Sequence, residues 1–444
     1  MIKKMELRNN IKQLGAGLCA LMLGMFMSSC EQEDQAKEYG ISSIYMPQSV
    51  NVSLGLNALF PVPNSSNYES STGYNYIVDS EAGTTNVLLG VMLSGSHTSA
   101  YSVEIVSDKD TINDLISKGT LGENYIALPE NLFKLPANID VPESGRATFQ
   151  LSIQNSVITN PEYFDKHLIA AVRLRNPSKY ALHESNAVTI VDLHIAGLFP
   201  SARRVSDYAV RGGSIITIEG QNLKDVSELK LTGTEIAIPI TNQSANSITV
   251  EMPELGAFTR GTIDLVTPFG TTKSAFEIFN IDQALQVFAD AYGEGVAANT
   301  DGDDYGSRQS VSTTTKRRGT SSLAITYFGN NYSPGGLINN AGFIDQGYEY
   351  IVFWAKSTTN GNNNGGIQMS LMGDGMPAGY GNDFAGAAIV VGPEWTFYKI
   401  PIGKTSATPM WSKGSSFRKF GWRLNNWNVP NDETVYFDDV MFIK

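Results

Sequence analysis

The chain has 444 residues, with 32 Lys and Arg against 44 Asp and Glu, for a net charge of −12. Because like charges repel, an acidic chain of this kind is a poor binder of nucleic acid or of anionic membranes. Charged residues make up only 17% of the chain, and 42 glycines accompany many Thr, Ser and Asn. This composition favours strands and turns over helices.

The first 29 residues have the order of a secretory signal peptide. A basic start is followed by a short uncharged stretch over residues 15–27, too short to span a membrane, and then by two serines. The segment has a net charge of +3, from the basic residues Lys3, Lys4, Arg8 and Lys12 and the acidic residue Glu6. The rest of the chain therefore carries a net charge of −15. We expect residues 1–29 to be removed on export.

Cys30 follows the small residues directly and resembles the cysteine that is acylated in the lipobox of bacterial lipoproteins. A lipobox usually has Leu where Met27 stands, and the alternative is a buried cysteine beside an ordinary cleavage site. The resemblance implies lipidation of Cys30, and several acyl chains anchor a protein stably. Because Cys19 leaves with the signal, no disulfide forms within the mature chain.

Residues 30–38 read as a lipidated linker, in which residues 31–34 form an acidic cluster with the sequence EQED. The cluster resembles the export signal that sends Bacteroidetes lipoproteins to the outer face of the outer membrane. A solvated linker is the alternative, since acidic polar residues also make one. The resemblance implies a lipid-anchored protein of the outer membrane that faces the cell exterior.

Residues 39–196 alternate short β-rich runs with turn clusters. Apolar residues on both faces of the last predicted strand indicate that it is covered on both sides, as in a sandwich. The clearest predicted strands are 85–93, 147–153, 168–174 and 187–195. The phrases VMLSGSHTSAYSVEIVSDKD, LPENLFKLPANIDVPESGRATFQLSI and AAVRLRNPSKYALHESNAVTIV resemble the N-terminal domain of unknown function of many Bacteroidetes surface lipoproteins. That resemblance implies an Ig-like spacer.

Residues 197–282 read as a second, smaller sandwich. The phrase GGSIITIEGQNL places two glycines before an alternating strand, and NSITVEMPELGAFTRGTIDLVTPFGTTKSAFEI supplies three further strands. The pattern resembles the IPT/TIG family of Ig-like domains. The resemblance implies a stalk, and no ionisable cluster in the segment suggests a chemistry.

Residues 283–444 hold all five tryptophans of the chain: Trp354, Trp395, Trp411, Trp422 and Trp427. The phrases VFADAYGEG, GTSSLAITY, FWAKS and VYFDDVMF, in this order and spacing, resemble the jelly-roll carbohydrate-binding modules. The sequence therefore predicts an all-β chain of three tandem β-sandwich domains. Two are Ig-like spacers, and the C-terminal one is a galactose-binding-like jelly roll.

The stretch from Phe417 to Trp427 carries the side chains that sugar binding requires. A pyranose ring offers an apolar face to flat aromatic rings and an equator of hydroxyls to Asn, Gln, Arg and Asp. Strand alternation predicts a core-facing set and an outward-facing set. The core set is Phe420, Trp422 and Leu424; the outward set is Lys419, Gly421, Arg423 and Asn425.

Four residues of this stretch are predicted to bind carbohydrate. Trp427 lies among asparagines in a loop, where little favours its burial, and Arg423 and Asn425 face outward beside it. Trp422 reads equally well as a core residue or as a ligand contact.

Two further aromatic residues complete the predicted site. Trp411 lies in the polar phrase TPMWSKGSS, and Tyr332 lies between asparagines and a serine. Gln368 and Ser370 are predicted to line the same outer sheet face. Trp354, by contrast, is predicted to be a core residue, because its strand has apolar residues on both faces.

The composition argues against several catalytic chemistries in residues 283–444. All four histidines precede residue 197, and no cysteine follows Cys30, so this segment has neither a His-based nucleophile relay nor His and Cys ligands for zinc. No strand carries the spaced acidic motif of a jelly-roll glycosidase. No organic cofactor is expected.

Carboxylates in this segment are candidates for structural calcium, which takes six to eight oxygen ligands. The run DGDD at 301–304 is too short for an EF-hand and reads as a solvated turn. In the jelly-roll modules that the segment resembles, a calcium ion often joins an acid of the last strand to the first strand. That resemblance implies a site made by Asp438 and Asp290.

The sequence as a whole predicts a non-catalytic, cell-surface glycan-binding lipoprotein that captures polysaccharide for a polysaccharide-utilisation system. The resemblance implies two partners, a TonB-dependent outer-membrane importer and its glycan-binding lid lipoprotein. The alternatives are a glycoside hydrolase or lyase with an unrecognised site, and a protein-binding adhesin or scaffold.

Overall fold

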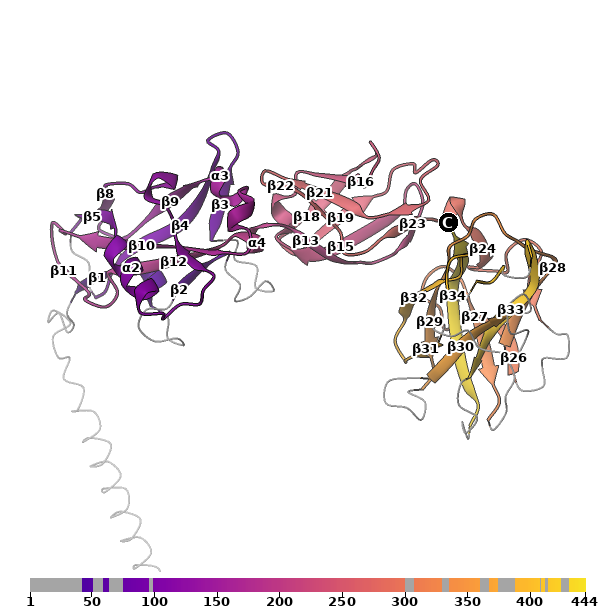
Figure 1. The fold of residues 1–444 in the computed structure, drawn as a ribbon. Helices are drawn as coiled ribbons and strands as arrows, with labels where there is room; N and C mark the ends of the chain where they lie inside the picture. The colour runs from indigo at the N-terminus through magenta and orange to yellow at the C-terminus, as the bar shows by residue number, and fades with distance from the viewer. Residues whose placement is uncertain are drawn as a thin grey trace, which may run out of the picture. The chain divides into compact units, whose positions relative to one another are not determined.

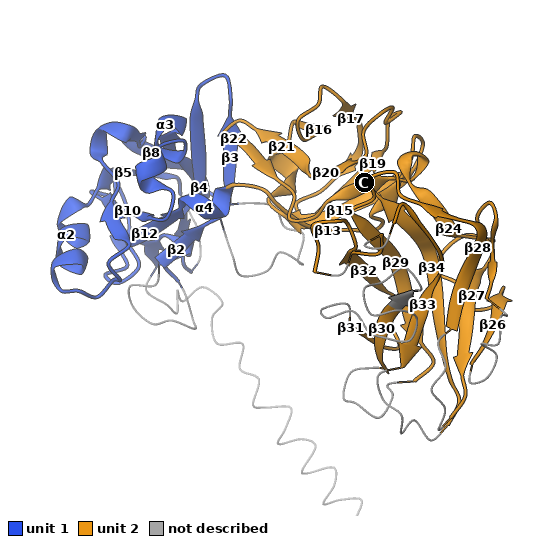
Figure 2. Ribbon diagram, turned by 45° about the vertical axis from the view of Figure 1, so that its right-hand side comes forward, with its two compact units in different colours: residues 1–67, 72–198 blue, residues 68–71, 199–444 orange. Residues whose placement is uncertain are grey.

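A computed structural model describes residues 42–50, 59–63, 75–95, 99–299, 307–329, 335–359, 367–373, 388–407, 409–411, 414–424 and 431–444. The chain is all-β and divides into two compact units, one ending at Leu198 and the other spanning 199–444 (Figure 2). Each unit is built mainly of β-strands, which are arranged in several sheets (Figure 1).

The first unit is a sandwich of two six-stranded sheets. One sheet has the order β11-β1-β4-β9-β7, with β3 paired to β4; the other has the order β2-β12-β10-β5-β8, with β6 paired to β10. The first sheet comprises β1 (Ser43–Tyr45), β3 (Tyr76–Asp79), β4 (Thr84–Leu93), β7 (Phe133–Lys134), β9 (Arg146–Gln154) and β11 (Ala181–Leu182). The second comprises β2 (Leu59–Val62), β5 (Tyr101–Ser107), β6 (Tyr125–Ala127), β8 (Asn138–Val141), β10 (His167–Arg175) and β12 (Val188–His194).

The four strands predicted in this unit are confirmed as β4, β9, β10 and β12. The helix α2 (Lys109–Ser117) was not predicted. Asp108 caps it by accepting the backbone N–H of Thr111 at 3.2 Å, and Ile112 and Leu115 pack onto β10 and β12. The described part of the unit also contains two shorter α-helices, α3 (Asn155–Ile158) and α4 (Ile195–Leu198).

The second unit begins with a small sandwich over residues 199–282, here called the middle sandwich. Its strands form three sheets with the orders β13-β15-β19-β18, β14-β23-β20 and β17-β16-β21-β22. They are β13 (Ser201–Val205), β14 (Ala209–Val210), β15 (Ile215–Gln221), β16 (Glu228–Leu231), β17 (Ala237–Ile238), β18 (Ile240–Gln243), β19 (Ser247–Glu251), β20 (Arg260–Gly261), β21 (Ile263–Thr267), β22 (Gly270–Lys273) and β23 (Ile278–Asn280).

Residues 283–444 form a larger sandwich, here called the C-terminal sandwich. Its six-stranded sheet has the order β26-β27-β34-β29-β32, with β24 paired to β34, and its five-stranded sheet has the order β25-β28-β33-β30-β31. The first contains β24 (Leu285–Phe288), β26 (Ser307–Ser312), β27 (Ser322–Tyr327), β29 (Tyr350–Ser357), β32 (Thr396–Pro401) and β34 (Glu433–Ile443). The second contains β25 (Val296–Ala298), β28 (Gly335–Ile344), β30 (Ile367–Gly373), β31 (Ala388–Val391) and β33 (Ser416–Leu424).

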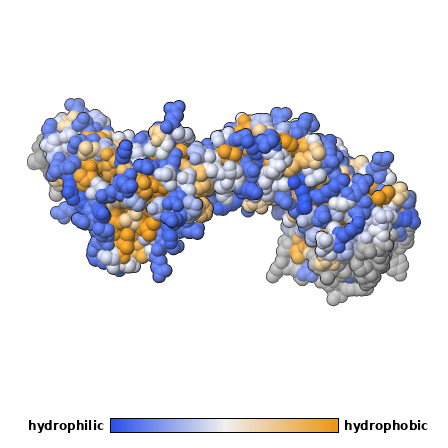
Figure 3. Space-filling model, turned by 45° about the horizontal axis from the view of Figure 1, so that its top comes forward, coloured by the Kyte–Doolittle hydropathy of each residue, from blue (hydrophilic) through white to orange (hydrophobic). Residues whose placement is uncertain are grey.

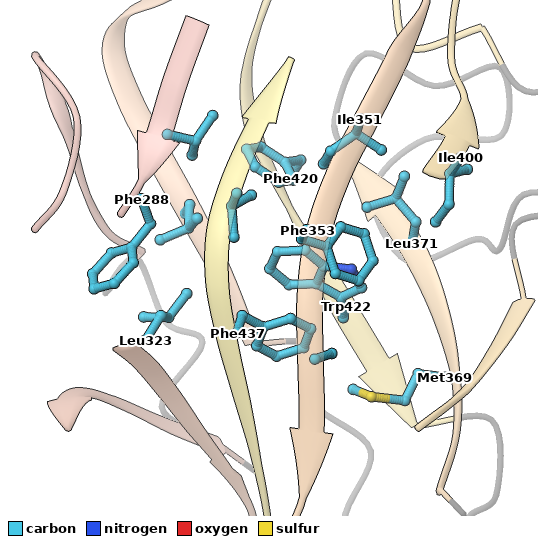
Figure 4. Packing of buried hydrophobic residues seen from close by; sticks show 14 of the residues in the cluster. Phe288, Leu323, Ile351, Phe353, Met369, Leu371, Ile400, Phe420, Trp422 and Phe437 are labelled. Carbon is cyan, nitrogen blue, oxygen red and sulfur yellow. The ribbon is translucent and has the colours of Figure 1, made fainter. Parts of the chain in front are cut away.

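The core of the C-terminal sandwich lies between these two sheets and is rich in aromatic rings (Figure 4). Trp422 of β33 stacks on Phe437 of β34, with ring centroids 4.0 Å apart, and meets Phe353 of β29 edge-on at 5.2 Å. All three side chains are fully buried. Large buried rings of this kind supply much of the apolar area that stabilises the domain.

Candidate functional site

The middle sandwich covers part of the outer face of the six-stranded sheet. Val352 and Met441 of this sheet are buried in one cluster with Ala209 and Phe279 of the middle sandwich. Apolar burial of this kind is characteristic of a structural contact. This part of the sheet is therefore unavailable to a ligand.

Aromatic and charged groups surround the same contact. Tyr208 of the middle sandwich stacks on Phe397 of β32, with centroids 4.4 Å apart and an interplanar angle of 17°. The guanidinium of Arg317 lies 3.7 Å from the ring centroid of Trp354, a close cation–π contact. The covered region with its flanking charges is here called the junction.

Two arginines of the C-terminal sandwich are paired with carboxylates at the junction. Asp207 of the middle sandwich binds both Arg317, at 3.3 Å, and Arg318, and the Nε of Arg318 lies 2.7 Å from a carboxylate oxygen of Asp439. Burial opposes the charge of Arg318, but Asp439 and Asp207 outweigh it and raise its pKa above the ordinary value. The charges of the junction are thus matched within the protein.

The outer face of the five-stranded sheet is built differently. In β33 the side chains of Phe420, Trp422 and Leu424 enter the core. Because successive side chains of a strand point to opposite faces, Lys419, Gly421 and Arg423 point outward. The alternation predicted for this strand is confirmed.

Neighbouring strands extend this outward row across the sheet. Arg423 lies opposite Ser370 of β30, and Gly421 lies opposite Gly336 of β28. A Cβ atom on Gly421 would lie 2.1 Å from the carbonyl oxygen of Gly335, so only glycine fits there. Both glycines are buried and Ser370 is only 1% exposed, so the middle of this row offers little surface to a ligand.

The polar groups of this face suit hydrogen bonding to hydroxyl groups or anions. Gln368 of β30 is exposed, whereas Lys419 and Arg423 are half-buried. Burial lowers the pKa of the Arg423 guanidinium, the opposite of the shift at Arg318. The outward side of β33 from Lys419 to Arg423, together with Gln368 of β30, is here called the β33 face and is the candidate binding site.

Two tryptophans predicted to touch the ligand lie in the core instead. Trp422 has no exposed surface and Trp411 is 4% exposed. The Nε1 of Trp411 donates a hydrogen bond to the carbonyl oxygen of Phe343 at 2.9 Å, and its ring packs 5.0 Å from that of Phe417. With their ring faces covered by other side chains, neither can stack on a sugar. The ligand contact predicted for Trp411 is therefore wrong, and of the two alternatives left open for Trp422 the structure has the core residue.

Trp354 is also placed differently from its prediction. Its strand is covered on both faces, as expected, but Phe353 faces the sandwich core while Trp354 is half-buried at the junction. The ring centroid of Tyr208 lies 6.0 Å away. Trp354 is therefore a contact residue between two sandwiches rather than a core residue of one.

Several predicted residues lie outside the described part of the chain. They are Cys30, Tyr332, Asn425 and Trp427, together with the acidic clusters at 31–34 and 301–304. Arg423 is thus the one predicted carbohydrate contact that the described residues place on the outer face.

Asp290 and Asp438, the predicted calcium ligands, line one cavity of about 490 Å³ together with Asp439 and two arginines, Arg211 and Arg318. Among the described residues, no three His, Cys, Asp or Glu side chains are grouped to hold a metal ion. The prediction of calcium therefore rests on these two carboxylates alone.

Backbone N–H groups already bind both of these carboxylates. Asp438 accepts hydrogen bonds from Arg317 at 3.0 Å and from Asp439 at 2.9 Å, and Asp290 accepts one from Ser321 at 3.0 Å. Burial, and then the neighbouring Asp439, raise the pKa of Asp438 to about 6. Hydrogen bonds, from Thr320 first, lower that of Asp290. Calcium stays a prediction.

The junction residues Asp207, Arg317 and Arg318 were not singled out from the sequence, and Asp439 was noted only as the neighbour of Asp438 in an acidic cluster. The adjacent pairs of like charge, RR at 317–318 and DD at 438–439, were the available signal. Two like charges side by side are costly unless an opposite pair lies close by.

A cavity in the first unit offers a different environment. Its volume is about 490 Å³, and apolar side chains from α2 and nearby strands dominate its lining, with Lys109 and Glu130 among the charged members. Figure 3 shows apolar patches interrupting the hydrophilic surface of this unit. Such a cavity suits a small apolar group better than a hydrated polymer.

Among the residues that the structure describes, no helix combines the length and apolarity required to cross a bilayer.

The site and fold together describe a modular all-β protein with a polar sheet face on its last domain. A family model for an N-terminal domain matches residues 44–181, and the IPT/TIG domain matches residues 204–275. The resemblances expected for the first two segments are confirmed by these matches. No curated protein matches the chain.

Among solved structures, the chain is similar to SGBP-B from a complex xyloglucan utilization locus in Bacteroides uniformis. The identity is 13%, over 82% of this chain and 96% of that one, with a TM-score of 0.39. A crystal structure with a xylogluco-oligosaccharide shares 14% identity over 81% of this chain and 76% of that one, with a TM-score of 0.36. A mutant of a family 29 carbohydrate binding module, complexed with mannohexaose, shares 10% identity over 36% of this chain and 90% of that one, with a TM-score of 0.24. Likeness at this level assigns no function.

Proposed function

We propose that the chain is a non-catalytic glycan-binding protein whose β33 face binds polysaccharide. The observation that carries the proposal is the row of polar side chains on the outer face of the five-stranded sheet, where Gln368 is exposed and Lys419 and Arg423 are half-buried. These amide, ammonium and guanidinium groups are donors that can bind the hydroxyls of a glycan.

The five strands of this sheet support a binding role without catalysis. Their sequences contain no Asp, Glu, His or Cys. Glycoside hydrolysis requires two carboxyl groups flanking the bond that is cleaved, and these strands supply none. The donors present can hold a glycan through hydrogen bonds.

The proposed setting is the cell surface. Acylation at Cys30 would tether the chain to the outer membrane, and the first unit with the IPT/TIG domain would act as a spacer for the C-terminal sandwich. Polysaccharide held there would be passed to a TonB-dependent importer and its glycan-binding lid lipoprotein. The proposal for these partners rests on the resemblance of the export signal and the domain order.

The direct test pairs binding with turnover. Electrophoresis of the full chain through gels containing each member of a polysaccharide panel should show retardation by at least one glycan. The same glycans should release no reducing sugar on incubation with the chain. Release of reducing ends would identify an enzyme, and the absence of retardation by every glycan would contradict the binding function.

A further inference from the structure

The chain crosses from one sheet of the first unit to the other directly after β7. The strand β7 pairs with β9 only at Ser152 and Ile153, whereas β4 pairs with β9 along its whole length. Pro136 follows β7 and lacks the backbone N–H that would continue the ladder. The chain then forms β8, which pairs with β5 of the other sheet. Among the described strands, none pairs with β9 on this side from Arg146 to Leu151.

A cavity lies beside β9 where the ladder with β7 stops. Its volume is about 570 Å³, within the range of roughly 300–1,000 Å³ that is usual for small-molecule sites. Thr148, Gln150 and Ser152 of β9 line one wall, and the crossover segment, including Pro136 and Asn138, lines the other. This cavity is here called the β9 cleft.

The polar side chains of the β9 cleft are accessible to a ligand. Thr148, Gln150 and Asn138 are exposed, and Ser152 is half-buried. The three side chains of β9 point away from the core because the residues that alternate with them are buried in it. The cleft is therefore an open feature of the sheet surface.

These four side chains are not engaged within the described part of the protein. None of them has a hydrogen bond or ion pair there. Gln154, at the end of the same strand and outside the cleft, differs in this respect, since its amide donates to the carbonyl oxygen of Asn131 at 3.2 Å. The polar groups of the cleft thus have only water or a ligand as partners.

The chemistry of the lining favours a neutral, hydroxyl-rich ligand. Amide and hydroxyl groups both donate and accept hydrogen bonds, as sugar hydroxyls do. The apolar side chains of Leu88, Leu135 and Pro136 also line the cleft and offer a surface to the C–H groups of a sugar ring. Lys134 is the one charged residue that lines it. A metal ion would require carboxylates, and a purely apolar ligand would leave the amides and hydroxyls without partners.

We propose that the β9 cleft is a second carbohydrate-binding site, which takes a mono- or disaccharide unit of a neutral glycan. The inference does not rest on the proposed function of the β33 face, because the cleft belongs to the first unit. The volume of the cavity limits the site to a short segment of a glycan chain.

Thiol footprinting reports the occupancy of the cleft separately from any other site. A chain that begins at residue 31 has no cysteine, and Thr148→Cys places a single thiol in the cleft. The rate of its alkylation by iodoacetamide is measured with and without cellobiose, xylobiose, mannobiose or maltose. At least one disaccharide should slow the reaction about tenfold at a concentration of ~10 Kd. Asn124→Cys, at an exposed position of the same unit outside the cleft, is the control and should react at an unchanged rate.

Side-chain truncation tests the hydrogen bonds of the cleft. Asn138→Ala and Gln150→Ala, each combined with Thr148→Cys, should raise the disaccharide concentration that gives half-maximal protection about 2- to 13-fold, as expected for the loss of one hydrogen bond. Asn124→Ala is the matched control and should leave that concentration unchanged. The melting temperature should stay nearly constant in all three variants, because each side chain is exposed.

The outcomes distinguish this site from the β33 face. The inference would be overturned if no disaccharide slowed alkylation at 148, or if the same sugar slowed it equally at 124. Normal protection in both Asn138→Ala and Gln150→Ala would also overturn it. Each of these results would leave the proposed function of the β33 face standing. Protection at 148, together with polysaccharide retention that persists when the β33 face is blocked, would support the β9 cleft and contradict the proposed site.

Discussion

The two sheets of the C-terminal sandwich share one core but use their outer faces in different ways. The six-stranded sheet buries Val352 and Met441 against the middle sandwich, and its arginines meet carboxylates of the same protein. The five-stranded sheet has outward arginine and lysine side chains beside paired glycines. Apolar burial against a second sandwich marks the first face as a structural contact, whereas exposed and half-buried polar side chains mark the second as a place for a ligand.

The distribution of tryptophan supports the same comparison. Trp422 and Trp411 stabilise the shared core, and Trp354 belongs to the junction. A high tryptophan content therefore does not by itself indicate that a domain has an aromatic binding platform. The predictions below test which residues stabilise the fold and which bind the ligand.

The largest effect should come from the shared core. Trp422→Ala removes a fully buried ring that stacks on Phe437 and should destabilise the protein by ~3–5 kcal/mol. Chemical denaturation of the full chain measures this change. A stability equal to that of the unchanged protein would show that the indole is not in the core.

A smaller loss of stability is expected at the junction. Trp354→Ala removes a ring that packs at a tilt against Phe397 and lies under Arg317, and should cost about 1–3 kcal/mol. The contact joins the middle sandwich to the C-terminal sandwich. In the unchanged protein we expect the two sandwiches to unfold in one calorimetric transition, and in Trp354→Ala we expect two separate transitions. Glycan affinity should not change. Weaker glycan binding with an unaltered melting profile would indicate that the site lies on the six-stranded sheet, contrary to the proposal.

An effect on binding without an effect on stability is predicted for Trp427. An aromatic face that receives a sugar contributes about 0.5–1.5 kcal/mol beyond area burial, so Trp427→Ala should weaken glycan retention by roughly 2- to 13-fold. The melting temperature should stay nearly constant. Trp422→Ala, five residues away in the sequence, is the contrasting variant, because it acts through stability. Normal retention by Trp427→Ala would remove Trp427 from the predicted site.

The smallest effect concerns metal. If calcium joins Asp290 to Asp438, EDTA should lower the melting temperature by a few degrees, and added Ca²⁺ should restore it. Asp438→Asn should abolish the response to chelation. An unchanged melting temperature in EDTA would leave both carboxylates as acceptors of the backbone hydrogen bonds already described.

Strand positions and the core-facing residues of β33 could be predicted because alternation is a local property of the sequence. The domain that packs against an outer face of a sheet could not be predicted from the sequence. Trp354 lies in a strand with apolar residues on both sides, and the sequence does not say that one side meets Tyr208 of another sandwich. Trp411 lies in a polar phrase, yet it is buried because its Nε1 reaches the carbonyl oxygen of Phe343. Both outcomes depend on tertiary contacts that no local pattern records.

The central claim is that the ligand lies on the five-stranded sheet, and site-directed labelling tests it most directly. The chain has two cysteines, Cys19 and Cys30, so a chain that begins at residue 31 has none. A single cysteine can then be placed at the exposed Gln368 of β30 or, as control, at the exposed Ser310 of β26 on the other sheet. Each is coupled to a bulky maleimide. We predict that the label at 368 abolishes polysaccharide retention and that the label at 310 leaves it intact; the reverse result would contradict the account.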